Sequence, residues 1–486
     1  MNTPVLVGVG VATQREDDPA RAMEPLDLML AAVRNAAADA APEPAKLLAG
    51  VGRIGVPKGR WRYQNPGGGI ARAIGADRAV SLLASVGVLQ QTLIGDACRA
   101  IADGEVDSAL VVGGDAGYRI LRAQISGVRA EERQQEDEPH VFLSPKDELR
   151  HPAELRAGMK MPVGLYAMME SAYRAQNGWS IDGHRDRLAA MYSRFSEIAA
   201  GNPHAWNRRH VDAQTIRNAS ERNAMQAFPY TKLHCSTWNV DQAGALLFCS
   251  AKRADELGIA HDKRIYQRAS TESNHMAQVS TRPNIAACQG AGIAGRAALE
   301  AAELAIADID LVDLYTCFPV AVETYAAELG LPLARDLTVT GSMAFAGGPY
   351  NNYVIQATCR MAELLREGRG RHGLVSSVSG VLTKQAFGIW SRAPSRNGFV
   401  LRDVSEDVAR KVGVKHVAES ATGRGSIAGY TVVYERGKPP RGVAIVDIGD
   451  ARAVVQSEDP AIVARMESVE LCGATVQLGE NHSYTL

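Results

Sequence analysis

The sequence predicts an α/β protein that contains a duplicated unit, a helical insertion and a small C-terminal β domain. Continuous apolar runs, which suit buried strands, alternate with amphipathic helices in the first part of the chain. The same order of elements returns after residue 260. Short alternating strands separated by turn residues follow residue 396. These three observations define the fold class.

The first unit alternates strands with helices that cover them. Its last helix ends at Gly104, which suits a left-handed C-cap. The buried strand that follows is expected to stop at Gly113 and Gly114. This β-α-β order indicates a sheet covered by helices. The expected elements are strands over residues 5–11, 51–56 and 108–112 and helices over residues 25–41 and 88–103.

Residues 118–235 have a different character, because charges, aromatic residues and helical periods dominate and no apolar run indicates a strand. We interpret this segment as a mostly helical insertion that lies over the sheet domain. Its acidic run, residues 131–138, is interpreted as solvated surface in preference to a binding site. The apolar pattern restarts over residues 239–250 and leads into a helix over residues 251–257.

The second half of the chain repeats the order of the first. Helix 292–307 and strand 311–315 match the first helix and second strand of the first unit. Helix 354–366, strand 373–377 and Gly380 match its last helix, last strand and closing glycines. A duplicated α/β unit is the economical interpretation, and a coincidental α/β rhythm is the alternative.

The chain beyond residue 394 reads as a separate small β domain. Regularly spaced short strands are typical of a small antiparallel barrel. The expected strands are residues 426–435, 442–448, 452–456 and 474–477. The predicted domains are residues 1–117 with 236–260, the insertion 118–235, the second unit 261–395 and the β domain 396–486.

Charge and composition exclude several classes of function. The chain has 486 residues, 53 Lys and Arg against 54 Asp and Glu, and a net charge of −1. This balance gives no global field that would recruit nucleic acid or an anionic membrane. The first residues have neither the basic segment of a signal peptide nor the long apolar run of a membrane anchor.

The seven cysteines are scattered without a C-x-x-C pair, which argues against a disulfide framework and against a structural zinc site. We therefore expect a cytoplasmic protein without a metal centre. The glycine runs at residues 8–10 and 67–69 do not fit the dinucleotide fingerprint, so no nucleotide cofactor is expected.

Five segments together resemble the thiolase superfamily over residues 1–394. The resemblance implies two similar βαβαβαββ halves layered α-β-α-β-α, with the insertion as the loop domain. The segments are the unit from residue 88 to Gly114, the loop insertion, Asn239-Val-Asp-Gln-Ala-Gly-Ala245, Asp313-Leu-Tyr-Thr-Cys-Phe318 and Gly341-Ser-Met-Ala-Phe-Ala-Gly-Gly-Pro349.

Within that superfamily the chain is most similar to the type 1 thiolase-like proteins, whose sequences are commonly labelled acetyl-CoA acetyltransferase and which carry an extra C-terminal β domain. The pattern that supports this is Tyr-Thr-Cys-Phe-Pro at residues 315–319 with the glycine-rich run before Asn351. The resemblance implies a small-molecule acyl-CoA thioester as substrate or ligand. It also implies an OB-like C-terminal barrel, and a homodimer or a monomer.

At each position that matches a catalytic residue of the family, this chain has a different residue. The position of the nucleophilic cysteine falls at Gly87, that of the oxyanion-orienting asparagine at Tyr315 and that of the activating histidine at Gly348. The Cys-x-Gly segment falls within residues 376–380, where only serines are available. The sequence therefore argues against the ordinary two-step acyl transfer.

Tyr315 and Cys317 are the candidate catalytic residues. They stand two apart at the end of a buried strand, so both side chains are expected on one face, where the cysteine would serve as a nucleophile and the tyrosine as an acid or base. The alternative is that Cys317 packs in the core and Tyr315 bonds a backbone carbonyl. The candidate substrate-binding residues are Gly87, Gly347, Gly348, Asn351, Ser379 and Gly380.

Three functions remain open at this point. The first is a thiolase-like acyl-CoA-handling protein. The second is a carbon–carbon lyase that uses Tyr315 and Cys317, as tyrosines act in some aldolases of this fold. The third is a non-catalytic acyl-CoA-binding or scaffold protein. Lys384 is expected to meet an anionic group or a carboxylate, and Asn351 to bind ligand or to cap the helix that follows it.

Overall fold

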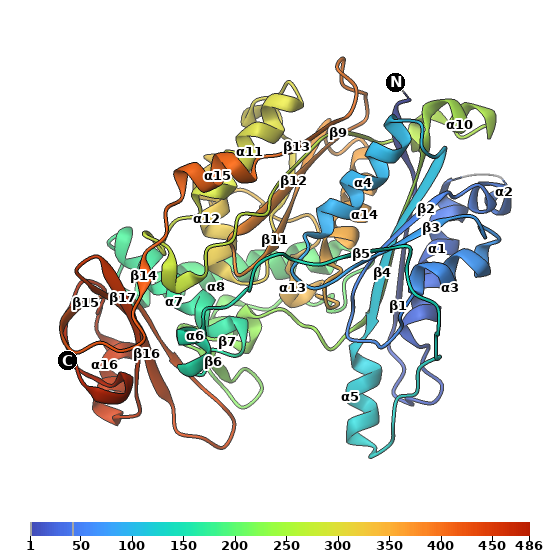
Figure 1. Cartoon of the computed structure of the whole chain (residues 1–486). Coiled ribbons are helices and arrows are strands. Elements are labelled where there is room, and N and C mark those ends of the chain that lie inside the picture. Colours follow the sequence, from blue (N-terminus) through green and yellow to red (C-terminus); the bar gives the residue numbers. More distant parts are fainter. Residues whose placement is uncertain (1, 41–42) are drawn as a thin grey trace.

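Five layers stack in the predicted order α-β-α-β-α (Figure 1). The structure is a computed structural model that describes residues 2–40 and 43–486. Two sheets form the second and fourth layers, and helices lie on their outer faces and between them. The predicted fold class is confirmed.

The first sheet has six strands in the order β1-β8-β4-β2-β3-β5. The pairs β1/β8 and β4/β8 are antiparallel, and β2 runs parallel to both β4 and β3. The strands are β1 (Pro4–Gln14), β2 (Arg53–Pro57), β3 (Val80–Ala84), β4 (Ser108–Ala116), β5 (Val141–Leu143) and β8 (Asp241–Ser250).

The second sheet repeats this pairing in the order β10-β11-β12-β9, with β13 added at the outer edge. The pairs β9/β12 and β11/β12 are antiparallel and β10/β11 is parallel, which matches β1/β8, β4/β8 and β2/β4 of the first sheet. The predicted duplication is therefore confirmed. The strands are β9 (Tyr266–Ser273), β10 (Leu311–Asp313), β11 (His372–Ser379), β12 (Lys384–Ser391) and β13 (Val400–Asp403).

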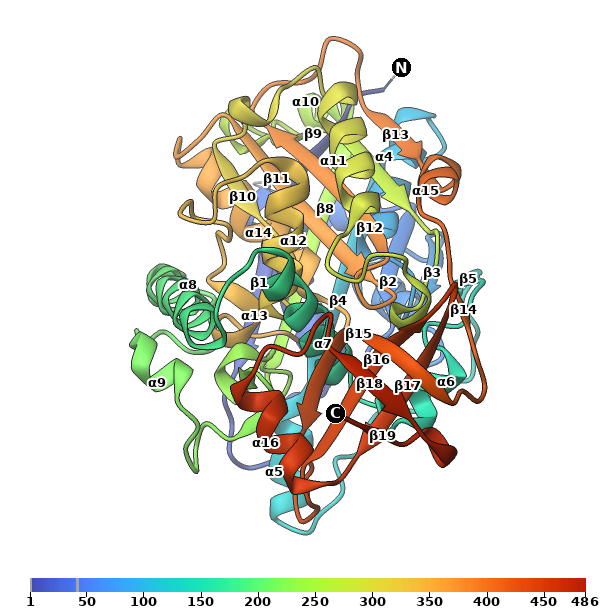
Figure 2. The ribbon, with the colours of Figure 1, turned by 90° about the vertical axis from the view of Figure 1, so that its left-hand side faces the viewer.

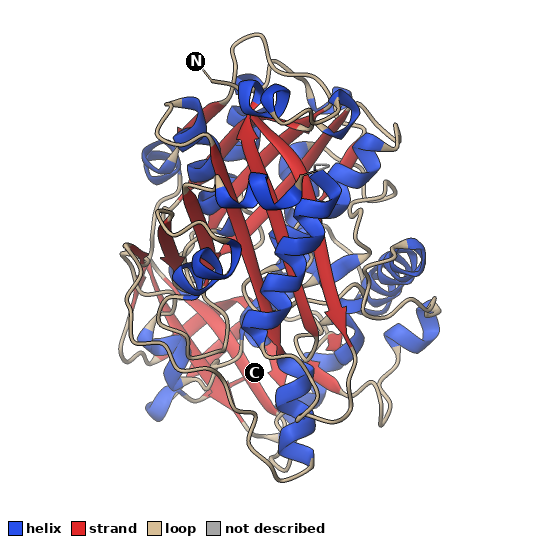
Figure 3. Cartoon of the chain, turned by 90° about the vertical axis from the view of Figure 1, so that its right-hand side faces the viewer, coloured by secondary structure: helices blue, strands red, loops and turns tan. Residues whose placement is uncertain are grey.

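Helices α4 (Gln90–Ala102) and α14 (Tyr353–Arg366) form the middle layer, where each contacts both sheets. Figure 3 shows helices lying across the outer face of the first sheet. The outer helices are α1 (Pro25–Ala40), α2 (Pro44–Ala49), α3 (Pro66–Ile74) and α10 (Ala251–Glu256) on the first sheet, and α11 (Gln289–Ala301) and α12 (Pro319–Leu329) on the second.

The strand predicted to stop before Gly113 instead continues as β4 to Ala116. A Cβ on Gly114 would lie 2.6 Å from the Cβ of Ala243 on β8, so glycine here permits close strand packing and does not end the strand. Helix α11 also ends earlier than predicted, at Ala301. Ala41, predicted as the last residue of the first helix, lies outside the described residues.

The insertion is mostly helical, as predicted, but it also contributes the short strands β5, β6 and β7. Helix α7 packs mainly against β15 (Gly423–Val433) and also against α12, and α8 packs against α13 (Ser342–Phe345), so these two helices lie on the second half and the C-terminal sheet. Its elements are α5 (Gly117–Ile125), α6 (Pro152–Arg156), α7 (Pro162–Gln176), α8 (Ile181–Gly201), α9 (Ala213–Arg217), β6 (Met225–Ala227) and β7 (Tyr230–Thr231).

The C-terminal strands follow the order β14-β17-β16-β15-β18-β19, and β6 of the insertion joins β15. They lie below α7 in Figure 2. That these strands make an OB-like barrel, and that this domain starts at residue 396, stay predictions. The elements are α15 (Ser405–Lys411), β14 (His416–Val417), β15 (Gly423–Val433), β16 (Arg441–Ile448), β17 (Ala451–Ser457), α16 (Pro460–Ser468), β18 (Thr475–Leu478) and β19 (Tyr484–Thr485).

A buried arginine fastens this C-terminal sheet to the second half. Arg452 on β17 is 1% exposed, and its Nε donates to Asp447 Oδ1 at 2.7 Å. Its Nη2 donates to the Pro283 carbonyl at 2.9 Å, and its Nη1 donates to the carbonyl of Arg282. One side chain thus satisfies carbonyl groups of a loop in another part of the fold.

Within residues 2–40 and 43–486, none of the helices combines the length and the apolarity that crossing a bilayer requires.

Replacing Arg452 with alanine is expected to lower the free energy of unfolding by roughly 1–3 kcal/mol, because it leaves buried carbonyl groups without their charged donor. Urea denaturation measures this loss. Arg410→Ala is the matched control, since Arg410 is exposed and pairs only within α15. Equal midpoints for both variants would show that Arg452 does not hold the domain.

Candidate functional site

The turn between β3 and α4, where the resemblance puts the nucleophile, is closed against the insertion. Gly87 has a φ of +104°, in the region that favours glycine. A Cβ at this position would lie 2.7 Å from Pro145 Cγ and 3.2 Å from Leu149 Cδ1. A side chain at residue 87 would therefore displace the loop that carries Pro145.

Lys384, from the second half of the chain, contacts the same turn. It stands at the start of β12 and is 4% exposed, and its Nζ donates to the Gly87 carbonyl at 2.6 Å. Burial lowers the pKa of Lys384, and the Glu272 carboxylate partly opposes this. The hydrogen bond goes to a backbone carbonyl, where sequence reasoning had expected an anionic partner.

Tyr315 and Cys317 lie just after β10. Tyr315 is half-buried, its N–H donates to Ser376 Oγ at 2.9 Å, and its ring meets Tyr353 edge-on at 5.6 Å. Cys317 is 7% exposed, and its carbonyl accepts from Ser236 Oγ at 3.1 Å. Burial raises the pKa of Cys317 to about 12 and the pKa of Tyr315 above its ordinary value. Both side chains keep their protons at neutral pH.

Tyr166 on α7 is a neighbour of this pair that the sequence did not reveal. Its ring centroid lies 4.5 Å from that of Phe318, and its hydroxyl interacts with the Cys317 thiol, which partly offsets the rise in the thiol's pKa. Burial raises the pKa of Tyr166 well above its ordinary value. The insertion therefore supplies part of the surroundings of Cys317.

The glycine-rich loop before α14 lies beside the same region. Gly348 donates its N–H to the Thr237 carbonyl at 2.9 Å. A Cβ at Gly348 would lie 3.1 Å from Met343 Cε and 3.4 Å from Ser236 Cβ, so the space next to this residue is filled. Gly347 faces away from that contact, because its Cβ would meet Gln242 Oε1 at 2.1 Å.

Asn351 and Asn352 connect the two halves instead of facing a cavity. Asn351 Nδ2 donates to the Lys58 carbonyl at 3.1 Å, and Asn352 Nδ2 donates to the Gly113 carbonyl at 2.9 Å. Neither side chain caps α14, although Asn352 occupies the N-cap position. Both side chains thus hold the loop before α14 to backbone carbonyl groups of the first half.

Ser379 and Gly380 end β11 and begin its turn into β12. Ser379 pairs with Lys384 across the hairpin, so it stands next to the group that holds Gly87. Gly380 (φ +59°), Val381 (φ +54°) and Leu382 (φ +70°) all adopt left-handed backbone conformations. Such conformations cost about 1–3 kcal/mol for each residue other than glycine and must be held by their surroundings.

Arg282 holds this turn. It is 5% exposed, and its Nε donates to the Ala277 carbonyl at 2.9 Å. Its Nη2 donates to the Val381 carbonyl and lies 3.5 Å from the carbonyl oxygen of Gly380. The guanidinium therefore donates to carbonyl groups of two loops and, from Nη1, to Met169 Sδ at 3.0 Å.

A cavity of about 210 Å³ opens beside this turn, at the N-terminus of α11. Cys288 in its wall donates from Sγ to the Leu382 carbonyl at 3.0 Å. Among the described residues, Oε1 of the buried Gln385 has no hydrogen-bond partner. The lining combines apolar residues (Ala277, Ala287, Leu382, Val408 and Val412) with polar and basic ones (His275, Arg282, Asn284, Cys288, Gln289, Thr383, Gln385 and Lys411).

The structure brings the predicted residues together in two groups. Cys317 and Gly348 lie near Ser236, which donates to the Cys317 carbonyl and would lie 3.4 Å from a Cβ at Gly348, and Tyr315 stands two residues before Cys317. Gly87, Ser379 and Gly380 lie around Lys384 and the turn that walls the cavity, although none of them is among its lining residues. Gly347 and Asn351 lie outside both groups.

No family model matches the chain. An acetyl-CoA acetyltransferase of Methanocaldococcus jannaschii is 28% identical over 166 residues, which are 34% of this chain and 40% of that protein. The chain thus spans less than half the length of that curated relative.

Solved structures give matches over more of the chain. A monomeric SCP2-thiolase-like protein type 1 from Mycobacterium smegmatis is 26% identical, with a TM-score of 0.82 over 100% of this chain and 99% of that one. The Ltp2–ChsH2(DUF35) aldolase is 17% identical, with a TM-score of 0.60 over 80% of this chain and 97% of that one, and shares the fold. With its duplicated five-layer core and a full-length match in fold and sequence, the chain belongs to the thiolase superfamily.

Proposed function

We propose that this protein binds the thioester end of an acyl-CoA and holds it without forming a covalent acyl-enzyme. The observation that carries this proposal is the closed turn at Gly87, which Pro145 and Lys384 contact from two sides. The candidate nucleophile, Cys317, keeps its proton at neutral pH because burial raises its pKa to about 12. Acyl transfer through a thiolate therefore has no support from the chemistry of these positions.

The cavity at the N-terminus of α11 is the proposed binding place. At about 210 Å³ it is smaller than the pockets that enclose a whole drug-sized ligand, so it suits a short acyl group and part of the pantetheine arm. Its apolar wall suits the acyl chain, and the exposed Lys411 suits a phosphate outside. Like the turn at Gly87, it adjoins the hairpin that contains Ser379 and Gly380.

A carbon–carbon lyase is the second candidate function. The observation that favours it is the group of three protic side chains, Tyr166, Tyr315 and Cys317, of which Tyr315 keeps part of its surface exposed. Because all three remain protonated at neutral pH, the role open to Tyr315 is that of a general acid. The aldolase that shares this fold supports the class of reaction only by analogy.

We also propose that the protein is a monomer in the cytoplasm. β5 of the insertion pairs with β3 and covers the edge that β3 would otherwise present to another chain. The similar type 1 protein of Mycobacterium smegmatis is described as monomeric. All seven cysteines are free thiols among the described residues, which fits a reducing compartment.

Calorimetric titration with acetyl-CoA and with free CoA tests the binding proposal. Ala287→Phe fills the cavity and is expected to weaken acetyl-CoA binding at least tenfold, which is about 1.4 kcal/mol. Ala38→Phe, at an exposed position of α1, is the matched control and is expected to bind like the unmodified protein. Absence of measurable binding, or equal binding by both variants, would refute the assignment.

Turnover of a panel of acyl-CoA and hydroxyacyl-CoA compounds tests the lyase candidate. If the unmodified protein cleaves one of them, Tyr315→Phe is expected to slow cleavage by about 10²-fold or more, the range that general acid–base catalysis supplies. Cys317→Ala is compared with Cys235→Ala, a second thiol whose pKa burial raises to about 12. Unchanged turnover in both Tyr315→Phe and Cys317→Ala would show that these residues do not carry out the cleavage.

Light scattering after gel filtration measures the oligomeric state. A monomer is expected at every concentration, because β5 already occupies the edge of β3. Phe142→Lys, which places a charge on the exposed Phe142 of β5, is expected to leave the mass unchanged. A dimer that this substitution dissociates would contradict the proposal and would identify β5 as the interface.

A further inference from the structure

Three side chains of the types that ligate metals meet in the interior, between α7, α8 and α12. Glu170 and His184 are 0% exposed and Glu323 is 1% exposed. His184 Nε2 lies 2.6 Å from Glu170 Oε1 and 3.9 Å from Glu323 Oε2. One ligand atom from each residue falls within 4.8 Å of the other two. These residues form the Glu170–His184–Glu323 cluster.

The cluster contains a carboxylate oxygen that the protein does not satisfy. Among the described residues, Glu323 Oε2 has no hydrogen-bond partner, although it points toward His184 Nε2. Two carboxylates in one dry space repel each other, so the cluster needs positive charge, which a proton on one of its groups or a bound cation can supply.

We propose that the Glu170–His184–Glu323 cluster binds a divalent transition-metal cation through His184 Nε2 and one oxygen of each glutamate. A neutral imidazole with two carboxylates suits Zn²⁺, Mn²⁺ or Fe²⁺. A divalent ion cancels the two carboxylate charges, which removes the cost of burying them. It also gives Glu323 Oε2 the partner that it lacks.

The distances fit such an ion after small shifts. Ligand atoms around a tetrahedral zinc ion lie roughly 3.3 Å apart, given bonds of about 2.0–2.1 Å. The observed separations of 2.6 Å and 3.9 Å fall on either side of that value. All three ligand atoms lie within 4.8 Å of one another, so binding one ion requires only shifts of the side chains.

Neighbouring side chains contact Glu170 and His184, although among the described residues His184 Nδ1 has no hydrogen-bond partner. The Tyr230 hydroxyl donates to the second carboxylate oxygen of Glu170, as outer-shell partners of metal ligands do. The His184 ring stacks on Trp179 with centroids 5.2 Å apart. Since α7 and α8 belong to the insertion and α12 to the second half, the ion would tie these two parts together. None of the three ligands belongs to the proposed acyl-CoA site.

Metal analysis by mass spectrometry tests the proposal on the full-length protein from cultures supplemented with Zn²⁺ and Mn²⁺. A near-stoichiometric divalent ion is expected in the unmodified protein. Glu323→Gln is the informative variant, because glutamine has the shape of a protonated glutamate but no negative charge. It is expected to lower the metal content roughly tenfold or more and to lower the melting temperature.

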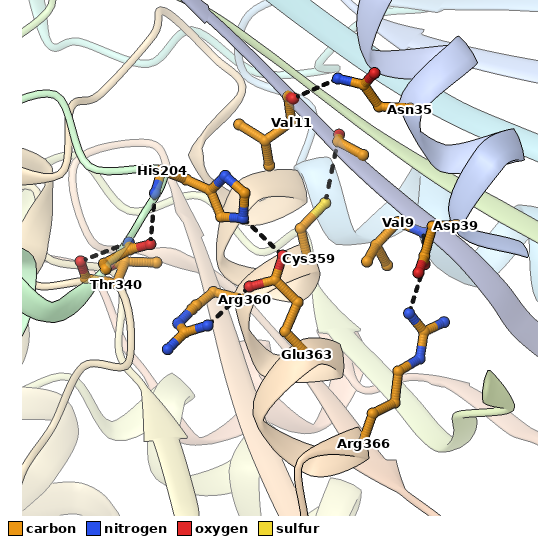
Figure 4. A network of polar contacts seen from close by, with 12 residues as sticks. Val9, Val11, Asn35, Asp39, His204, Thr340, Cys359, Arg360, Glu363 and Arg366 are labelled. Atoms are coloured by element: carbon orange, nitrogen blue, oxygen red, sulfur yellow. Dashed lines mark hydrogen bonds and ion pairs between the residues drawn. The ribbon is translucent and has the colours of Figure 1, made fainter. Parts of the chain in front are cut away.

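Glu363→Gln is the matched control. Glu363 also pairs with a histidine, at 2.7 Å from His204 Nε2, and its other oxygen accepts from Arg360 at 2.9 Å (Figure 4). This variant is expected to keep the metal. An unmodified protein without metal would overturn the proposal and would assign a proton to the cluster. Full metal retention in Glu323→Gln would also overturn it, since the ion would then lie elsewhere.

Discussion

The two middle helices set the position of everything around the candidate site. Helices α4 and α14 each pack against both sheets, so neither can shift without opening a core. Their N-termini are joined directly, because Gln90 Oε1 accepts the N–H of Val354 at 2.8 Å. The turn at Gly87 precedes α4 and the glycine-rich loop precedes α14. This contact between helix ends therefore ties the two candidate loops to each other.

Local sequence patterns predicted the elements well, because each sheet buries continuous apolar strands and each helix has an apolar face. Strand β4 shows where such patterns fail. Gly113 and Gly114 look like a strand end, yet they let β4 approach Asn352 and Ala243, which are distant in sequence. The meaning of a glycine depends on what approaches it, and the sequence does not contain that information.

The candidate site was predictable only in part, for the same reason. The adjacency of Tyr315 and Cys317 follows from their spacing in the chain. The contacts of Tyr166 with Cys317 and of Lys384 with Gly87 join segments far apart in the sequence, and no periodicity indicates them. The Glu170–His184–Glu323 cluster has the same origin, since three separate helices supply it.

Two buried arginines connect the C-terminal sheet to the turn after β11. Arg282 holds the left-handed turn at residues 380–382, and the carbonyl of Arg282 accepts in turn from Arg452 of the C-terminal sheet. The C-terminal sheet is thereby linked, through one residue, to the left-handed turn of the second half. A substitution in either arginine would be felt in both parts of the molecule.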